Sequence, residues 1–285
     1  MRKSDSYLAL SSGKIPFGSM RKDHMSKLIA EIGWNHMGDM DLAKSMVFAA
    51  AQSGADYAKF QTWSVDNLKS GPWDDDGRRQ IYEKAQINRD QHHQLADFCR
   101  DANIGFLTSC FNKADLPMIR ELGDMVKIAS TECTNEELVL EAINMFNTVL
   151  ISTGATKFEE ASRWAEYGNV VLLHCVSSYP CPADQVNLQR IEGLRSLTPR
   201  VGYSGHYDGY FDAIAAATMG CEYIEKHFTT DKTLPGRDNK FALLPEDLEI
   251  IANYMREVNL MQVDRGRDYQ QCEQEARDVY AGRWS

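Results

Sequence analysis

Short apolar runs recur along the chain at regular intervals, and each is followed by a stretch with helical spacing. Leu42, Met46 and Ala49, for example, repeat apolar residues every three or four positions, which is typical of a helix with one buried face. Apolar runs without alternation indicate parallel strands buried on both faces, and eight strand–helix units favour a closed barrel over an open sheet. The predicted fold class is therefore α/β, a (β/α)8 TIM barrel. Its strands are expected at residues 28–33, 56–60, 105–110, 125–129, 149–153, 170–175, 200–206 and 222–228.

The length of 285 residues suits a single barrel domain, for which roughly 200 to 250 residues are routine, together with tails. We expect an N-terminal extension at residues 1–26, a barrel domain at 27–262 and a helical tail at 263–285. The tail should contain a polar helix from about Arg267 to Tyr280, and a helix after residues 244–247 should close the barrel. Residues 63–88 interrupt the alternation after the second strand, so they form either a lid over the active face or an exposed insertion.

Charge and composition restrict the partners of this chain. A net charge of -10 disfavours binding to nucleic acid or to an anionic membrane, because such binding needs a basic surface. No apolar run approaches the roughly 20 residues that span a bilayer, and the first residues resemble no secretory signal. Seven cysteines without a CxxC pair fit a reducing compartment. The expectation is a cytoplasmic protein that acts on small molecules.

Two histidines, His206 and His227, each lie at the end of an apolar run that is predicted to be a strand. The small and apolar residues at 209–220 between them suit a helix packed on a sheet, so the histidines should lie at the carboxyl ends of neighbouring strands. Two imidazoles so placed suit a divalent transition metal with positions left open for substrate. For either histidine alone, the more frequent alternative is a strand cap or a core position with satisfied hydrogen bonds.

Polar side chains also gather where the other predicted strands end. A single Ser or Thr at such a position more often bonds to the local backbone, but repetition over most of the strands favours one mouth lined with ligand groups. Hydroxyls beside lysines form a natural cradle for phosphate. Asp238, in the turn after the eighth strand, either binds substrate hydroxyls or forms the turn. The strand-end residues are Glu31, Lys59, Gln61, Thr108, Ser109, Lys127, Ser130, Ser152, Thr153, His174, Ser177, Tyr179 and Ser204.

A set of motifs occurs in order and with barrel spacing between about Lys27 and Leu260. In this arrangement the chain resembles the sialic acid synthase (N-acetylneuraminate synthase) family, and an ordered set is far more specific than any single motif. The motifs are 29–38 (IAEIGWNHMG), 59–62 (KFQT), 127–130 (KIAS), 151–154 (ISTG), 173–175 (LHC), 179–180 (YP), 202–206 (GYSGH) and 225–229 (EKHFT).

The resemblance implies an enzyme that condenses phosphoenolpyruvate with the open-chain aldehyde of an N-acetylmannosamine-like amino sugar. The products would be phosphate and a sialic-acid-like 2-keto-3-deoxy nonulosonic acid. Glu31 matches the family's catalytic carboxylate, and His206 and His227 would hold a divalent ion, Mn²⁺ or else Mg²⁺ or Co²⁺. The implied phosphoenolpyruvate-binding residues are Lys59, Ser109, Lys127, Ser130, Ser152 and Ser204. The implied sugar-binding residues are Gln61, Phe111, Tyr179 and Asp238.

The chain departs from the family pattern at several points. Gly205 stands where Asp is common, Ser177 where Asn is usual, and Ser109 with Cys110 where Thr-Pro is usual. Family members usually continue into an antifreeze-like domain that, in a swapped dimer, lends an Arg to the sugar's acyl group. We expect a homodimer. Because this sequence stops at Ser285, we also expect a separate antifreeze-like partner protein as an alternative source of that domain, and an altered or relaxed acceptor preference.

Three other functions stay open on the sequence alone. One is a phosphoenolpyruvate-dependent condensing enzyme whose acceptor is a non-acylated aldose. Another is a non-catalytic subunit that needs a partner chain, although Glu31, Lys59 and Lys127 are all present. The third is a pyruvate aldolase with a Schiff-base lysine, which would leave the hydroxyl cradle unexplained.

Overall fold

A computed structural model describes residues 26–284. Of the predicted N-terminal extension, residues 1–25 lie outside the described residues. Two compact units divide the chain, one that includes residues 26–261 and another that includes residues 262–284. The first unit contains every strand of the described chain, and the site described below lies in it.

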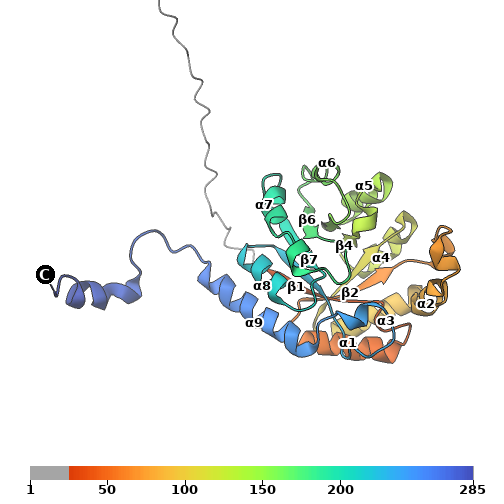
Figure 1. Ribbon diagram of the computed structural model, residues 1–285, viewed down its shortest axis with the longest axis horizontal. Helices are drawn as coiled ribbons and strands as arrows, with labels where there is room; N and C mark the ends of the chain where they lie inside the picture. Colours follow the sequence, from red (N-terminus) through yellow and green to blue (C-terminus); the bar gives the residue numbers. More distant parts are fainter. Residues whose placement is uncertain (1–25, 285) are drawn as a thin grey trace, which may run out of the picture. The chain divides into compact units, whose positions relative to one another are not determined.

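Eight parallel strands close into a barrel, and each strand pairs with the next one along the chain (Figure 1). The last strand pairs with the first, so that the ring has no free edge. This confirms the predicted TIM barrel, and the strand bounds lie within two residues of those expected. The strands are β1 (Lys27–Gly33), β2 (Tyr57–Thr62), β3 (Gly105–Cys110), β4 (Met125–Ile128), β5 (Thr148–Ser152), β6 (Val170–Cys175), β7 (Val201–Gly205) and β8 (Tyr223–His227).

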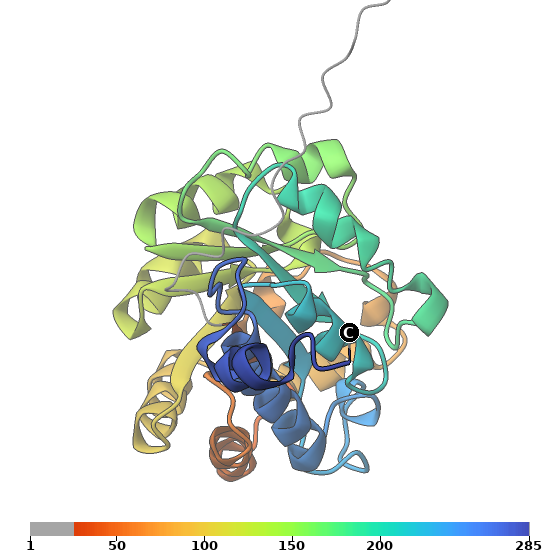
Figure 2. The same ribbon diagram turned by 90° about the vertical axis from the view of Figure 1, so that its left-hand side faces the viewer.

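Helices surround the strands, as the two views show (Figures 1 and 2). Side-chain caps define where several of them begin. Asp39 accepts bonds from two backbone N–H groups of the first helix, and Asn88 forms a capping box with Gln91. The helices are α1 (Met40–Gln52), α2 (Arg78–Ala85), α3 (Arg89–Asp101), α4 (Leu116–Leu122), α5 (Glu136–Met145), α6 (Phe158–Ser162), α7 (Gln189–Arg195), α8 (Phe211–Thr218) and α9 (Pro245–Met261). Within residues 26–284, none of these helices has the length and apolar composition that crossing a membrane would require.

Two segments outside the strand–helix alternation also have defined structure. The insertion at residues 63–88 is folded: it contains short 3-10 turns at Val65–Asn67 and Pro72–Asp74, followed by α2. In the second unit, helical turns run without interruption from Gln271 to Tyr280: a 3-10 turn at Gln271–Glu273 is followed by further helical residues and a π-helical turn at Ala276–Tyr280. The helix thus begins four residues later than expected and ends at the expected residue.

A buried polar cluster connects β7, β8 and α8 on the outside of the barrel. Lys226 donates to Asp212 at 2.8 and 3.0 Å, and Tyr203 donates to the same carboxylate at 2.8 Å. Lys226 also donates to the backbone oxygen of Tyr207 at 2.8 Å, which ties the loop after His206 to the eighth strand. A Cβ at Gly205 would lie 2.3 Å from Asp212 Oδ2 and 2.5 Å from the Tyr203 ring. The cluster therefore explains why this position is a glycine.

We expect Asp212→Ala to lower the free energy of unfolding by about 3–5 kcal/mol, because it leaves the Lys226 ammonium buried without its carboxylate. The matched control is Asp208→Ala, which removes an exposed ion pair with Lys232 (3.3 Å) in the same segment and should cost at most about 1 kcal/mol. Urea denaturation followed by circular dichroism measures both. Equal losses of unfolding free energy in the two variants would show that the buried Lys226–Asp212 pair stabilises the fold no more than an exposed ion pair does.

Candidate active site

Strand alternation decides which side chains enter the barrel. Ile29, Leu107 and Leu150 belong to a small apolar cluster inside it, separate from the large core between strands and helices. Successive side chains of a strand point to opposite faces, so the residue two positions later points inward as well, nearer the carboxyl end. A polar layer therefore follows the apolar one. Its members include Glu31, Lys59, Ser109, Lys127, Ser152, Cys175 and Glu225.

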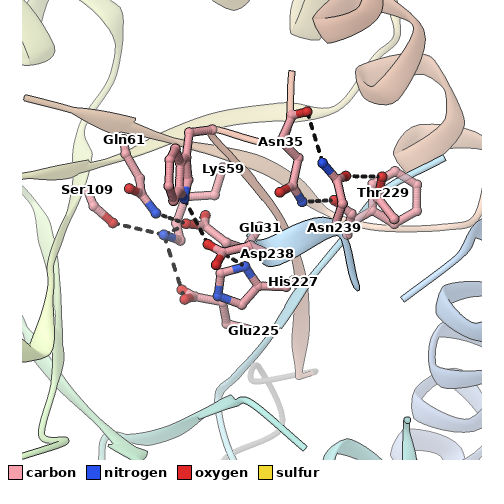
Figure 3. Close-up of polar contacts among 12 residues, drawn as sticks. Glu31, Asn35, Lys59, Gln61, Ser109, Glu225, His227, Thr229, Asp238 and Asn239 are labelled. Atoms are coloured by element: carbon pink, nitrogen blue, oxygen red, sulfur yellow. Dashed lines mark hydrogen bonds and ion pairs between the residues drawn. The ribbon is translucent and has the colours of Figure 1, made fainter. Parts of the chain in front are cut away.

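Lys59 is the centre of this layer (Figure 3). Its ammonium lies 2.6 Å from Glu31 Oε2 and 3.6 Å from Glu225 Oε1, and it donates to Ser109 Oγ at 2.8 Å. Burial lowers the pKa of Lys59, but the carboxylates of Glu225 and Glu31 together raise it above the usual value. Lys59 is therefore a permanent positive charge in a site shielded from water.

Glu225 is a site residue to which the sequence analysis assigned no role. Its carboxylate lies between Lys59 and Lys127, 3.5 Å from the latter, and accepts a hydrogen bond from Ser204 at 2.9 Å. Burial raises the pKa of Glu225, but the two lysines and Ser204 outweigh it and hold the pKa below the usual value. The signal was present in the sequence, since Glu225 precedes His227 by two residues on one strand and shares its face.

Glu31 has the opposite titration behaviour. Burial raises its pKa, and Lys59 and the hydrogen bond from Gln61 Nε2 (2.8 Å) lower it by less, so the net shift is upward. Two carboxyl groups that share one lysine thus have pKa values displaced in opposite directions. Such a pair suits different tasks, because the Glu225 carboxylate is held in its ionised form while Glu31 binds a proton more readily than an ordinary glutamate does.

Hydroxyl groups converge at the ends of β4, β5 and β6, and the second lysine, Lys127, lies on β4. Burial lowers the pKa of Lys127 more than the Glu225 carboxylate raises it. A Cβ at Gly154 would lie 2.4 Å from Ser177 Oγ and 2.8 Å from Ser130 Oγ, so the glycine allows these groups to converge. Among residues 26–284, the buried Oγ atoms of Ser152 and Ser177 have no hydrogen-bond partner. Unpartnered hydroxyls beside a buried cation are suited to an anionic ligand.

The two predicted metal ligands lie together, with ring centroids 5.4 Å apart. His206 Nδ1 donates to the backbone oxygen of Val176 at 2.7 Å, which leaves Nε2 as the nitrogen that can hold a metal ion. Burial and the neighbouring His206 lower the pKa of His227 well below the usual value, so this ring is neutral. Within the described part of the chain, His227 Nδ1 is buried without a hydrogen-bond partner. Both rings therefore fit a divalent transition ion.

The number of protein ligands available to such a metal centre is small. No cluster of three or more His, Cys, Asp or Glu side chains in residues 26–284 is arranged to hold a metal ion. Asp238 comes nearest to being a third group, with Oδ2 3.7 Å from His227 Nδ1. The protein would thus supply two imidazoles and leave the other positions to substrate or water, which is the pattern of a catalytic rather than a structural site.

Two of the predicted sugar-binding residues, Tyr179 and Asp238, lie beside the two histidines, and Gln61 contacts Glu31. The Tyr179 ring lies 4.0 Å from the His206 ring and 6.1 Å from that of His227, measured between centroids. Asp238 accepts a hydrogen bond from Trp34 Nε1 at 2.8 Å, a partner that sequence reasoning did not identify. Phe111 directly follows β3, and its backbone N–H group donates a hydrogen bond to the Thr62 carbonyl oxygen at 3.4 Å.

Comparison with known proteins shows which family and which proteins this chain is similar to. Residues 46–266 match the model of the NeuB family. The N,N'-diacetyllegionaminic acid synthase of Campylobacter jejuni is 34% identical over 252 residues, which cover 81% of this chain and 75% of that protein. The N-acetylneuraminate-9-phosphate synthase of Drosophila melanogaster is 31% identical, over 83% of this chain and 68% of that protein.

A solved structure agrees with these matches. The N-acetylneuraminic acid (sialic acid) synthetase from Leptospira borgpetersenii, crystallised in complex with citrate, superimposes with a TM-score of 0.80. The two chains are 30% identical, and the match covers 88% of this chain and 90% of that one.

We expect sulfate, whose charge does not change over the range, to bind more weakly as the pH rises from neutral to about 10. The reason is the lowered pKa of Lys127: this lysine loses its proton, and with it the attraction for an anion, at a lower pH than an ordinary lysine does. Lys127→Ala should bind sulfate roughly tenfold less tightly at neutral pH and lose most of the pH dependence.

Calorimetric titration at several pH values measures this effect, and Lys44→Ala, which removes an exposed lysine of α1, serves as the matched control. The control should behave as the parent does. If the sulfate affinity of Lys127→Ala fell as steeply with rising pH as that of the parent, the fall would come from a group other than Lys127.

Proposed function

The chain belongs to the NeuB family and is a sialic-acid-type synthase, and from this membership and the site geometry we propose the reaction that it catalyses. It condenses phosphoenolpyruvate with the open-chain form of an N-acetylmannosamine-like amino sugar. The products are phosphate and a sialic-acid-like 2-keto-3-deoxy nonulosonic acid. The observation that carries the proposal is the pairing of two buried lysines, set among serine hydroxyls, with two adjacent imidazoles at the same mouth.

Phosphoenolpyruvate carries a phosphate and a carboxylate, and the polar layer offers groups for both. Lys59 and Lys127 are buried cations on β2 and β4, and Ser152 presents a hydroxyl without a partner among the described residues. Charge-assisted hydrogen bonds in a water-poor site are the strong ones, which favours a doubly anionic donor. The proposed donor-binding residues are Lys59, Ser109, Lys127, Ser130, Ser152 and Ser204.

In the proposed reaction, the methylene carbon of phosphoenolpyruvate forms a bond to the aldehyde carbon of the sugar, the C=O π bond of the aldehyde breaks, and the aldehyde oxygen takes up a proton to become a hydroxyl group. Water adds to the enol carbon, and phosphate leaves from that carbon. Glu31 is the proposed catalytic carboxylate: its raised pKa and its position beside Lys59 suit a group that holds the attacking water and takes up its proton. Glu225, which stays ionised, offsets the positive charge of the two lysines.

His206 and His227 are the proposed ligands of a divalent cation, for which Mn²⁺ is the first candidate and Mg²⁺ and Co²⁺ are alternatives. When bound, such an ion polarises the sugar aldehyde toward attack. Gln61, Phe111, Tyr179 and Asp238 are proposed to contact the acceptor sugar. Dimer formation, a separate antifreeze-like partner protein and a cytoplasmic location stay predictions.

We expect His206→Ala and His227→Ala each to abolish Mn²⁺-stimulated phosphate release and to weaken Mn²⁺ binding, since each removes one of two protein ligands. Mn²⁺ binding is measured directly by electron paramagnetic resonance, and circular dichroism checks the fold. His93→Ala, which removes a histidine with a side chain 44% exposed, is the control and should bind Mn²⁺ as the parent does. Unchanged Mn²⁺ affinity in either site variant would remove that residue from the metal site.

One assay tests donor and acceptor together. The enzyme is incubated with Mn²⁺ and either phosphoenolpyruvate or pyruvate, in the presence of N-acetylmannosamine, its diacetamido relatives or mannose, and phosphate and keto-acid products are measured. The proposal requires phosphate release that depends on an acylated amino sugar. Product formation from pyruvate would indicate an aldolase, and a preference for mannose would indicate a non-acylated acceptor.

A further inference from the structure

Three aromatic side chains from separate segments meet beside the mouth of the barrel. Trp34 follows β1, Trp63 follows β2, and Tyr82 belongs to α2 in the insertion. The Tyr82 ring lies 5.6 Å from the Trp34 ring and 5.9 Å from the Trp63 ring, measured between centroids. The interplanar angles of 50° and 74° are those of tilted and edge-to-face contacts, which aromatic rings favour. We call Trp34, Trp63 and Tyr82 the mouth aromatic cluster.

Each indole of the cluster donates its N–H group to a proposed sugar-binding side chain. Trp34 Nε1 donates to Asp238 Oδ2 at 2.8 Å, a bond that joins the loops after the first and last strands. Trp63 Nε1 donates to Gln61 Oε1 at 3.3 Å, which is the longer and weaker of the two bonds. An indole N–H group can only donate, so Trp63 bonds to the oxygen of the Gln61 amide. The amide nitrogen of Gln61 therefore points away from Trp63.

The amide nitrogen so directed reaches the catalytic carboxyl group. Gln61 Nε2 donates to Glu31 Oε1 at 2.8 Å, so Trp63, Gln61 and Glu31 form a continuous hydrogen-bonded series. Trp34 and Asp238 form a second, shorter series that ends 3.7 Å from His227. Tyr82 lies between the two indoles and contacts both, and through it the insertion is packed against both series.

We propose that the mouth aromatic cluster positions the acceptor sugar. Trp34 and Trp63 are positioning residues that fix Asp238 and Gln61, and Tyr82 holds the two indoles in place. Residues 63–88 are therefore a fixed wall of the acceptor subsite. The inference rests on the proposed function, because it assigns sugar contacts to Gln61 and Asp238. Of the proposed donor-binding residues, Lys127, Ser152 and Ser204 lie on β4, β5 and β7, away from the segments that carry the cluster. Lys59 lies on β2, but it is held by Glu31, Glu225 and Ser109 and not by an indole, so we expect Trp34→Phe and Tyr82→Ala to change donor binding little.

The variants Trp34→Phe and Tyr82→Ala test the proposal in steady-state kinetics with phosphoenolpyruvate, Mn²⁺ and N-acetylmannosamine. Each should raise the KM for the sugar roughly tenfold and leave the KM for phosphoenolpyruvate within about twofold, since a hydrogen bond to a charged group is lost or misaligned. Tyr82→Phe keeps the ring and should restore the parent's sugar KM. Trp63→Phe should lower kcat as well, because it frees the amide that bonds to Glu31.

The insertion supplies its own control. Trp73 donates its indole N–H to the backbone oxygen of Lys69 at 2.7 Å within the same segment, so Trp73→Phe removes a similar bond outside the cluster and should leave both KM values unchanged. The double variant Trp34→Phe with Tyr82→Ala should be little worse than either single variant, as expected for residues that act through one contact.

Binding of N-acetylmannosaminitol, an open-chain alcohol that cannot react, gives a readout that does not need turnover. Calorimetry should show the same loss of affinity in Trp34→Phe and Tyr82→Ala and none in Trp73→Phe. Equal rises in both KM values, or an unchanged sugar affinity, would overturn the positioning role. A parent enzyme that binds the alcohol through the cluster but releases no phosphate would overturn the proposed function and leave the positioning role intact.

Discussion

The buried charge array of Lys59, Glu31, Glu225 and Lys127 is the constraint on which the rest of the site depends. Transferring a charge from water into a protein interior costs several kcal/mol, and only close opposite charges and hydrogen bonds offset that cost. Here each lysine lies beside a carboxylate, at 2.6 Å for Lys59 with Glu31 and 3.5 Å for Lys127 with Glu225. The array pairs two lysines with two carboxyl groups, so these contacts offset much of the cost of burying it before an anionic substrate enters.

Closure of the barrel brings these charges together. Glu31 on β1 is paired in register with Lys59 on β2 and also with His227 on β8, across the seam where the ring closes. Gln61 is in register with Ser109, and Ser109 with Lys127. A shift of one residue in any of these pairs would turn the inward side chains of that strand toward the helices. The same backbone register thus determines both the fold and the arrangement of charges.

Gly205, which differs from the family pattern, and the insertion at residues 63–88 both have physical reasons in the packing around the barrel. Gly205 leaves the space that Asp212 and Tyr203 fill, and Asp212 in turn neutralises Lys226 behind the strand that carries His227. Within the insertion at residues 63–88, Tyr82 packs against Trp63, and it also packs against Trp34 in the loop after β1; both indoles donate to side chains of the mouth. Both features act from outside the polar layer on the side chains within it.

The sequence by itself determined the barrel, because near-continuous apolar runs that alternate with helical stretches leave few other ways to bury so much apolar surface. It also determined that Glu31, Lys59, Lys127, His206 and His227 lie at strand ends, since a strand end can be recognised from neighbouring residues alone.

Only the tertiary structure decided which of these groups touch. The position of Glu225 between two lysines depends on strands far apart in the chain, and so do the opposite pKa shifts of Glu31 and Glu225. The bonds from Trp34 to Asp238 and from Trp63 to Gln61 likewise depend on where the loops come to lie. Electrostatic and hydrogen-bond energies vary with distances of a few ångströms, and a linear sequence does not contain distances between segments that meet only when the barrel closes.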